Sequence, residues 1–320
     1  MPSEDISTPA RILVIGGRGF VGSQVVRQLV ARGIGVHVFG PAMATDLLAD
    51  MAGRFGETIG SVEDRDAVRA AIAAAGATAI LTTAAYGEGR GLMHGGEANT
   101  DKAMAINVDG YRHVLEAARD AGIKRVLTTG SSVVFGPVEL YGEARVDEDA
   151  PRRPRTIYGL TKVLGEDLGQ YYRDRHGMDV SSIRLPLVLG PGLWYQGAAS
   201  AITAVLAAAR PGATHTVTFH DVRVDLMHVD DVARALVAAL LAPAPLDAVY
   251  HINGFTAAMS DIIAGAVQLV PDYRVEHVVV PPAMVFPLMD DRRFRERFGF
   301  VAEYDLPRLL SDQINEKVQA

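Results

Sequence analysis

Cysteine is absent from the 320 residues of the chain. Disulfide bridges, thiolate-bound metal ions, iron–sulfur clusters and cysteine nucleophiles are therefore excluded. A chain without disulfides suits a reducing compartment, and we expect it in the cytoplasm. The histidines show no spacing typical of metal ligands, so we predict no bound metal.

Long hydrophobic runs and an excess of positive charge are lacking as well. Residues 185–209 carry no charge, but prolines and glycines interrupt them. The uninterrupted part, residues 198–209, is shorter than the roughly 20 residues that a membrane-spanning helix needs. The formal net charge of −7 gives no overall basic surface for nucleic acid. We expect a soluble protein without membrane or nucleic-acid partners.

Apolar stretches alternate with amphipathic helical segments along the first half of the chain. Predicted strands are residues 11–16, 35–39, 79–82, 125–130 and 180–185. Predicted helices are residues 20–32, 64–75, 104–121 and 158–176. Strands that are apolar throughout and separated by helices indicate a parallel sheet covered on both faces. We predict an α/β protein with a doubly wound Rossmann sheet.

The alternation loosens after residue 185, where proline and glycine become frequent. We assign residues 9–185 to a dinucleotide-binding domain, to which residues 226–253 return. Residues 186–225 and 254–320 then form a smaller α+β lobe that binds the substrate.

Three glycines, Gly16, Gly19 and Gly22, follow the first predicted strand. A sharp turn from strand to helix needs unusual backbone angles, and a helix N-terminus must come close to a pyrophosphate. The spacing is typical of a dinucleotide site when it lies between a strand and a helix. We expect the loop, with Phe20 and Val21, to bind the cofactor; a tight turn without a ligand is the alternative.

The choice between NAD and NADP stays open. The second predicted strand ends at Phe39 without the acidic residue that commonly holds the adenosine ribose. Arg18 lies in the glycine loop, where it can reach a 2′-phosphate, but it can equally be an ordinary exposed arginine. Neither Arg nor Lys directly follows the second strand. These features favour NADP slightly.

Tyr158 and Lys162 are four residues apart on a predicted helix, so their side chains share one face. A phenol has an unperturbed pKa of about 10, and a nearby ammonium lowers it. The pair can take a proton from a hydroxyl, or return one to a carbonyl, while hydride moves to or from a nicotinamide. Ser131 ends a predicted strand at the ligand-binding edge, where its hydroxyl can orient the reacting oxygen. We predict that these three residues are catalytic.

Together these motifs resemble the extended short-chain dehydrogenase/reductase family, the NAD-dependent epimerase/dehydratase group. The resemblance rests on residues 16–22, Thr83-Ala84-Ala85, Asn107-Val108, Ser131, Tyr158, Lys162, Arg184, Gly190-Pro191 and residues 228–232. It implies cofactor contacts from Ser61, Val62, Thr83, Ala84, Ala85, Asn107, Tyr158, Lys162, Leu185 and Val188. It also implies a homodimer formed through the helices at 104–121 and 158–176.

Two departures from the family narrow the activity. Ser132 and Val133 stand where sugar-nucleotide dehydratases carry an acid pair, which disfavours dehydration. No asparagine follows the strand within residues 184–190, which weakens a nucleotide-sugar substrate. We predict an NAD(P)-dependent oxidoreductase that interconverts an alcohol and a carbonyl on a small polar substrate, such as a sugar, sugar acid or hydroxy acid. An NAD-dependent epimerase is the alternative, and a non-enzymatic cofactor sensor is a third.

The substrate pocket is harder to place. The glycine-rich residues 86–96 are expected over the nicotinamide side of the cleft, as a mobile lid or as a plain surface loop. Arg90 and His94 within them can bind an acidic substrate. Candidate pocket walls are Trp194, Tyr195 and Phe255.

Overall fold

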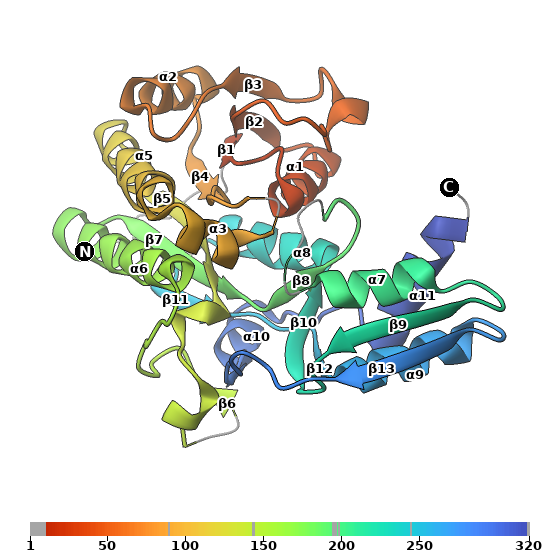
Figure 1. Cartoon of the computed structure of the whole chain (residues 1–320). Helices are drawn as coiled ribbons and strands as arrows, with labels where there is room; N and C mark the ends of the chain where they lie inside the picture. The colour runs from red at the N-terminus through yellow and green to blue at the C-terminus, as the bar shows by residue number, and fades with distance from the viewer. Residues whose placement is uncertain are drawn as a thin grey trace.

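The computed structural model of the protein describes residues 11–88, 90–142, 145–193, 197, 199–243 and 245–318. A parallel sheet of seven strands lies at its centre (Figure 1). The strands are β1 (Arg11–Ile15), β2 (Gly35–Gly40), β3 (Gly56–Ile59), β4 (Ala79–Thr82), β5 (Arg125–Ser131), β7 (Asp179–Leu185) and β11 (Val249–His251). They lie in the order β11-β7-β5-β4-β1-β2-β3, and every neighbouring pair is parallel.

Helices cover both faces of this sheet. Side chains alternate along β1, so that Ile12 and Val14 belong to one apolar cluster and Leu13 and Ile15 to another. The first face carries α1 (Phe20–Ala31) and α8 (Val229–Leu240), and the second carries α2 (Arg65–Ala75), α5 (Gly110–Asp120) and α6 (Ile157–His176). The two apolar faces explain why the inner strands β1 and β4 are apolar on both sides.

The direction of winding reverses between β1 and β4. From β1 the chain moves outward to β2 and β3, then returns to β4 on the other side of β1. Loops leave neighbouring strands in opposite directions at such a point, and a crevice opens at the carboxyl edge of the sheet. The predicted doubly wound Rossmann fold is confirmed.

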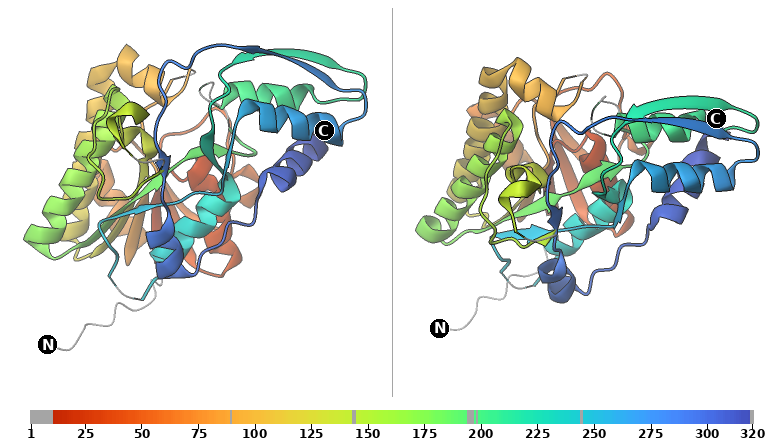
Figure 2. Two further views of the ribbon diagram at one scale, coloured as in Figure 1. Left: turned by 90° about the horizontal axis from the view of Figure 1, so that it is seen from below. Right: turned by 60° about the horizontal axis from the view of Figure 1, so that its bottom comes forward.

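A smaller α+β lobe lies beside the sheet domain (Figure 2). Its strands are β8 (Leu187–Leu189), β10 (Val224–His228) and β12 (Phe255–Ala257) in one sheet, and β9 (Thr214–Phe219) with β13 (Arg274–Val279) in another. Its helices are α7 (Ser200–Ala208), α9 (Met259–Leu269) and α11 (Leu306–Val318). Val205, Ile262 and Leu310 belong to a buried cluster of this lobe alone, which gives it a core of its own. The predicted C-terminal lobe is confirmed.

The chain crosses between the two parts several times. β11 pairs with β7 at the edge of the main sheet, whereas β10 pairs with β8 and β12 in the lobe. Farther along, Phe294 of α10 (Arg292–Phe298) returns to the sheet domain, where its ring lies 5.7 Å from that of Tyr250. The domain boundaries drawn at residues 185, 226 and 253 stay a prediction.

Short elements complete the structure. They are α3 (Leu92–Ala98), α4 (Thr100–Met104), the π-helical turn η2 (Ala105–Asp109), the 3-10 turns η1 (Ala49–Met51), η3 (Ser132–Val134) and η4 (Val138–Leu140), and the strands β6 (Arg145–Val146) and β14 (Leu288–Met289). The helix expected at 104–121 is helical in the structure, but helical structure already begins at α4 and includes the π-helical turn η2 before α5. Strand β3 escaped prediction because Ile59 is its only large apolar residue and is itself exposed.

Among the described helices, none is both long enough and apolar enough to cross a membrane.

Candidate active site

The glycine loop joins β1 to α1 and leaves no room for a side chain at Gly16 or Gly22. Gly16 has a φ of +78°, and a Cβ there would lie 2.8 Å from Thr83 Oγ1. A Cβ on Gly22 would lie 2.3 Å from the main-chain oxygen of Gly16. Gly19 is the N-cap of α1 and brings no side chain across the helix N-terminus. An open helix N-terminus behind a bare glycine loop fits the pyrophosphate of a dinucleotide, which Phe20 and Val21 would contact through their main-chain N–H groups.

Thr83 follows β4 and fixes the shape of this loop. Its hydroxyl lies 3.2 Å from the main-chain oxygen of Ile15 and 3.1 Å from that of Gly16, and donates to them. Ala84 and Ala85 continue the chain along the same edge, half-buried. The segment after β4 therefore packs closely against the glycine loop, and a Cβ on Gly16 would lie 2.9 Å from Ala84 N.

Two further segments border the carboxyl edge of the sheet. After β3, the Ser61 hydroxyl donates to Glu63 Oε2 over 3.1 Å, and the carbonyl of the buried Val62 accepts from the Nδ1 of His113 over 2.9 Å. On the opposite side, Leu185 ends β7 and Val188 lies in β8, both buried. These predicted contact residues thus lie on four segments at the carboxyl edge of the sheet; Asn107, Tyr158 and Lys162 lie on η2 and α6. Their contacts with a cofactor stay a prediction.

Tyr158 and Lys162 lie where α6 begins beside the end of β5, and Ser131 is the last residue of that strand. Thr156 caps α6 by accepting a hydrogen bond from Gly159 N over 3.0 Å. Lys162 Nζ donates to the main-chain oxygen of Thr129 over 2.6 Å and lies 5.5 Å from the centre of the Tyr158 ring. Ser131 lies two residues beyond Thr129, and its hydroxyl accepts from Val133 N over 3.4 Å.

Burial shapes the chemistry of this group. Tyr158 is 7% exposed. Burial lowers the pKa of Lys162 to about 8, although the carboxylate of Glu166 acts to raise it. An ammonium group beside a buried phenol stabilises the phenolate form of that phenol. The arrangement can therefore hold and release a proton at the tyrosine oxygen.

The profile of the NAD dependent epimerase/dehydratase family matches residues 12–253 of the chain. The chain belongs to this family. The matched region contains all of the predicted cofactor and catalytic residues, so the resemblance deduced from the motifs is confirmed.

Known proteins similar to this epimerase/dehydratase-family chain include two dehydrogenases. The mitochondrial L-threonine 3-dehydrogenase of Bos taurus is 28% identical over 229 residues, which are 69% of this chain and 61% of that protein. The uronate dehydrogenase of Pseudomonas putida is 39% identical over 98 residues, 29% of this chain and 36% of that protein. The matches thus span less than two thirds of either relative. Among solved structures, the L-threonine dehydrogenase from Clostridium difficile has a TM-score of 0.85 at 21% identity, with 98% of both chains covered, which confirms the fold.

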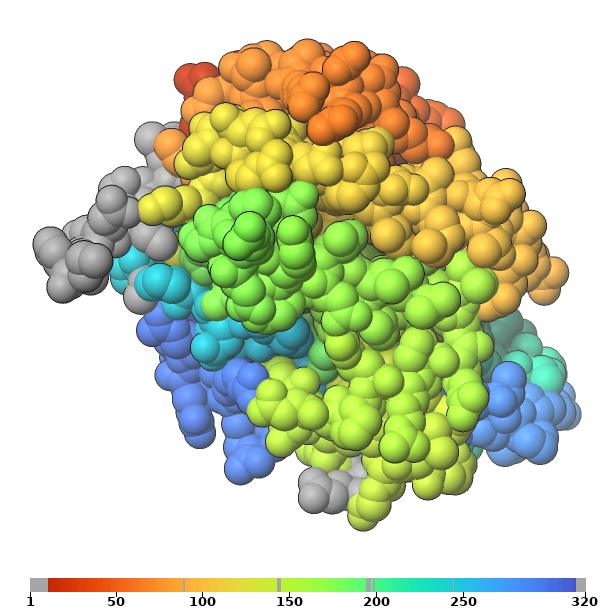
Figure 3. Space-filling view, turned by 90° about the vertical axis from the view of Figure 1, so that its left-hand side faces the viewer, coloured from red at the N-terminus to blue at the C-terminus, as the bar shows by residue number. Residues whose placement is uncertain are grey.

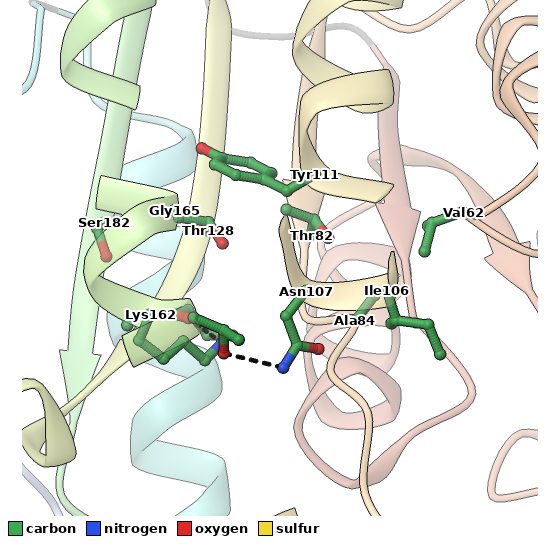
Figure 4. Close-up of a pocket in the computed structure, with 13 residues that line it drawn as sticks. Val62, Thr82, Ala84, Ile106, Asn107, Tyr111, Thr128, Lys162, Gly165 and Ser182 are labelled. Carbon is green, nitrogen blue, oxygen red and sulfur yellow. Dashed lines mark hydrogen bonds between the residues drawn. The ribbon is translucent and has the colours of Figure 1, made fainter. Parts of the chain in front are cut away.

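Asn107 links the segment after β4 to helix α6. It lies on the π-helical turn η2, and its Oδ1 accepts from Tyr86 N over 2.7 Å. Its Nδ2 donates to Thr161 Oγ1 over 3.0 Å, and that hydroxyl donates to the main-chain oxygen of Tyr158 over 2.8 Å. Figure 4 shows Asn107 pointing toward α6 across the cavity that Lys162 also lines. Asn107 was expected at the cofactor, but the structure assigns it this bridge as well.

A buried ion pair lies behind Lys162, and sequence reasoning missed half of it. Glu166, one turn farther along α6, accepts from Arg184 Nε over 2.7 Å and from Nη2 over 2.8 Å. Arg184 Nη1 also donates to His251 Nε2 over 3.0 Å, and burial lowers the pKa of that histidine to about 3, so it stays neutral. The spacing from Lys162 to Glu166, again four residues, was the available signal.

Arg18 does not extend freely from the glycine loop. Its guanidinium is hydrogen-bonded to the carboxylates of Asp46 and Glu57, and it lies 5.9 Å from the centre of the Phe55 ring. From the sequence, we expected the Arg18 side chain either to be exposed or to reach a 2′-phosphate. The structure instead shows it 14% exposed and engaged with two acids.

The residues expected to form a lid or to line the substrate pocket lie in different surroundings. Residues 92–98 form helix α3, so the segment is not simply a loop. A Cβ on Gly96 would lie 3.2 Å from Tyr158 N, which shows that this glycine allows α3 to pack against the start of α6. Arg90 and His94 are exposed. Phe255 packs with the cluster of the lobe, and Trp194 and Tyr195 lie outside the described residues.

Proposed function

We propose that the protein is an NAD(P)-dependent oxidoreductase that interconverts an alcohol and a carbonyl on a small polar substrate. The observation that carries this proposal is the placement of Lys162 between Thr129 and the Tyr158 ring, at the end of the sheet where the glycine loop opens. The similarity to dehydrogenases of threonine and of uronate supports a substrate with a hydroxyl and a carboxylate.

The nicotinamide, when bound, supplies the hydride acceptor or donor. The chain's own groups supply the rest. The N-terminus of α1 and the loop of Gly16, Gly19 and Gly22 bind the pyrophosphate. For oxidation, the Tyr158 oxygen takes the proton of the substrate hydroxyl, and for reduction it returns that proton to the carbonyl oxygen.

Lys162 and Ser131 assist from either side of the tyrosine. The Lys162 ammonium stabilises the phenolate, and its bond to Thr129 fixes its position. The Ser131 hydroxyl, at the end of β5, hydrogen-bonds the reacting oxygen and orients it. No acid or base follows at Ser132 and Val133, which favours oxidoreduction over dehydration.

The experiment that tests this function is a substrate panel. Purified protein is incubated with NAD⁺ or NADP⁺ and with L-threonine, hexuronates, aldonates and aldoses, and reduced cofactor is measured at its absorbance band. Turnover with at least one hydroxy acid or sugar acid is expected. Substrates that are epimerised without net reduction of added cofactor, by protein that retains its nucleotide through purification, would establish the epimerase alternative instead.

We also propose a homodimer through α5 and α6, in the cytoplasm. Figure 3 shows the face formed by these helices, and two large apolar side chains of α6 are exposed, Leu160 at 40% and Tyr171 at 56%. Light scattering after gel filtration is expected to give twice the chain mass of 34.2 kDa. The double variant Leu160→Glu/Tyr171→Glu should give the monomer mass; a monomeric wild type would overturn the dimer.

A further inference from the structure

We propose that a second cavity, which opens beside α10, binds a small organic anion that carries a phosphate or a carboxylate group. The cavity has a volume of about 460 Å³. Its walls come from β6, from the segment between β11 and β12, and from α10 with the residues before and after it. These elements lie together in the lower half of Figure 1. Among the described residues that line the cavity, none belongs to the glycine loop or to the group of Tyr158, Lys162 and Ser131. The inference is therefore independent of the proposed function.

The size and the walls of this cavity suit an organic molecule. Sites for small organic ligands in proteins usually have volumes of about 300–1,000 Å³. Val301 and Ala302 form an apolar part of the wall, and Gly254 contributes no side chain. Most of the remaining wall is charged, and its three basic side chains are Arg145, Arg292 and Arg295.

Arg145 is held in place at the β6 wall. Its Nη1 donates to the main-chain oxygen of Met289 over 2.7 Å and to Asp225 Oδ1 over 3.4 Å. Its Nη2 donates to Thr256 Oγ1 over 2.8 Å. These acceptors lie on three different strands, β14, β10 and β12. The Arg145 side chain is still 41% exposed, so a positive charge in a fixed position borders the cavity.

The two arginines of α10 are more exposed than the acids that pair with them. Arg292 and Arg295 are three residues apart and share one face of the helix. Arg292 Nε donates to Asp290 Oδ2 over 2.7 Å. Arg295 Nε lies 3.0 Å from Asp291 Oδ1. The arginine side chains are 71% and 53% exposed, whereas each aspartate is 17% exposed. An anion that enters the cavity therefore meets the guanidinium groups before the carboxylates.

Hydrogen-bond donors remain for such an anion. A guanidinium has five N–H groups, and its planar edge matches two oxygens of a phosphate or a carboxylate. Within the described part of the chain, Nη1 of Arg292 and both Nη groups of Arg295 have no acceptor. The wall carries three arginines and two aspartates, and Asp225, the partner of Arg145, does not line it. The charge of the wall therefore favours an anion over a cation.

The first test is protection of the wild-type protein from phenylglyoxal, which modifies exposed arginines, measured by peptide mass spectrometry. The probes are glycerol 3-phosphate and succinate, with the uncharged glycerol and succinamide as controls. At saturation, at least one of the two anions should slow the modification of Arg292 and Arg295 by about tenfold or more. Arg297, exposed on the same helix but outside the cavity, should be modified at an unchanged rate. Lack of protection by both anions, or equal protection of Arg297, would overturn the inference.

The second test uses variants, and the probe concentration that half-protects Arg292 reports affinity at this site. Arg295→Gln should weaken binding of the protecting anion by about tenfold or more, because both Nη donors are lost. Asp291→Asn should tighten it, because a negative charge is removed and Arg295 is released.

The matched control is Arg297→Gln, which makes the same change of charge on α10 and should leave the affinity unchanged. Opposite effects of Arg295→Gln and Asp291→Asn would distinguish loss of a binding group from loss of structure. An affinity of Arg295→Gln equal to that of the wild type or of Arg297→Gln, or weaker binding by Asp291→Asn, would contradict the inference.

Discussion

Lys162 donates a hydrogen bond of 2.6 Å to the main-chain oxygen of Thr129. This bond ties the second turn of α6 to the end of β5, and it directs the ammonium toward the ring of Tyr158, 5.5 Å away. The sheet therefore fixes the position of a charge beside the phenol.

Removing that charge should abolish most activity. Lys162→Met is expected to lower kcat by about a hundredfold or more, because the phenolate loses its stabilising cation. Lys102→Met is the matched control, since Lys102 pairs with Glu63 over 2.8 Å and lies outside the catalytic group. Steady-state rates of the two variants check this expectation. Equal losses in both would show that Lys162 has no special role.

The same lysine should leave a signature in the pH dependence of stability. Its pKa is lowered by burial to about 8 in the folded state, against 10.5 for an unperturbed lysine. Between these values the unfolded chain binds more protons, so the free energy of unfolding rises with pH, by up to about 1.4 kcal/mol per pH unit. Urea unfolding of wild type and Lys162→Met across pH 8 to 10.5 measures the difference. A difference independent of pH would contradict the lowered pKa.

Asn107 should matter for both stability and rate. Asn107→Ala leaves Tyr86 N and Thr161 Oγ1 without their bonds to the amide, and should cost about 1–3 kcal/mol of the free energy of unfolding. The displaced start of α6 should also lower kcat. Asn99→Ala is the comparison. It removes the cap on Lys102 N and a side-chain hydrogen bond with Tyr86, and should cost about 1 kcal/mol without a change in kcat.

Because the glycine loop is closely packed, adding a side chain at Gly22 should have a strong steric effect on cofactor binding. Gly22→Ala places a Cβ 2.3 Å from Gly16 O, a main-chain atom that cannot rotate away, so cofactor affinity should fall by about tenfold or more. Gly142→Ala has no atom within 4 Å of its new Cβ and should bind as the wild type does. Calorimetric titration of both variants with NAD⁺ measures these affinities. Unchanged affinity in Gly22→Ala would mean that the loop does not form the cofactor site.

Breaking the buried pair behind Lys162 should be costly. Glu166→Gln leaves Arg184 buried without its carboxylate partner and should destabilise the protein by about 3–5 kcal/mol. Asp167→Asn, next along the helix, breaks only an exposed bond to Arg152 and should cost less than about 1 kcal/mol. Urea unfolding of both variants makes the comparison; similar stabilities would show that the pair is not required.

Local patterns in the sequence predicted much of this site. Gly16, Gly19 and Gly22 lie within a single turn from strand to helix, and Tyr158 and Lys162 lie one helical turn apart. Short stretches of sequence therefore determine the geometry of both motifs. The apolar strands likewise predicted a sheet buried on both faces.

Contacts between distant segments escaped prediction. Arg18 meets Asp46 and Glu57 across 28 and 39 residues, and Asn107 meets Thr161 across 54. Such contacts depend on how whole helices and strands pack together, and this packing cannot be read from local patterns in a single sequence. The slight preference for NADP, which rested on Arg18 and on the lack of an acidic residue at the end of the second strand, took no account of these contacts of Arg18.

The most direct test of the account compares wild type with Tyr158→Phe, using the best substrate of the panel. The variant keeps the ring and loses only the hydroxyl. We predict that it binds NAD⁺ as the wild type does while kcat falls by at least about a hundredfold. Turnover that survives the loss of this hydroxyl would contradict the assignment of Tyr158 as the group that moves the proton.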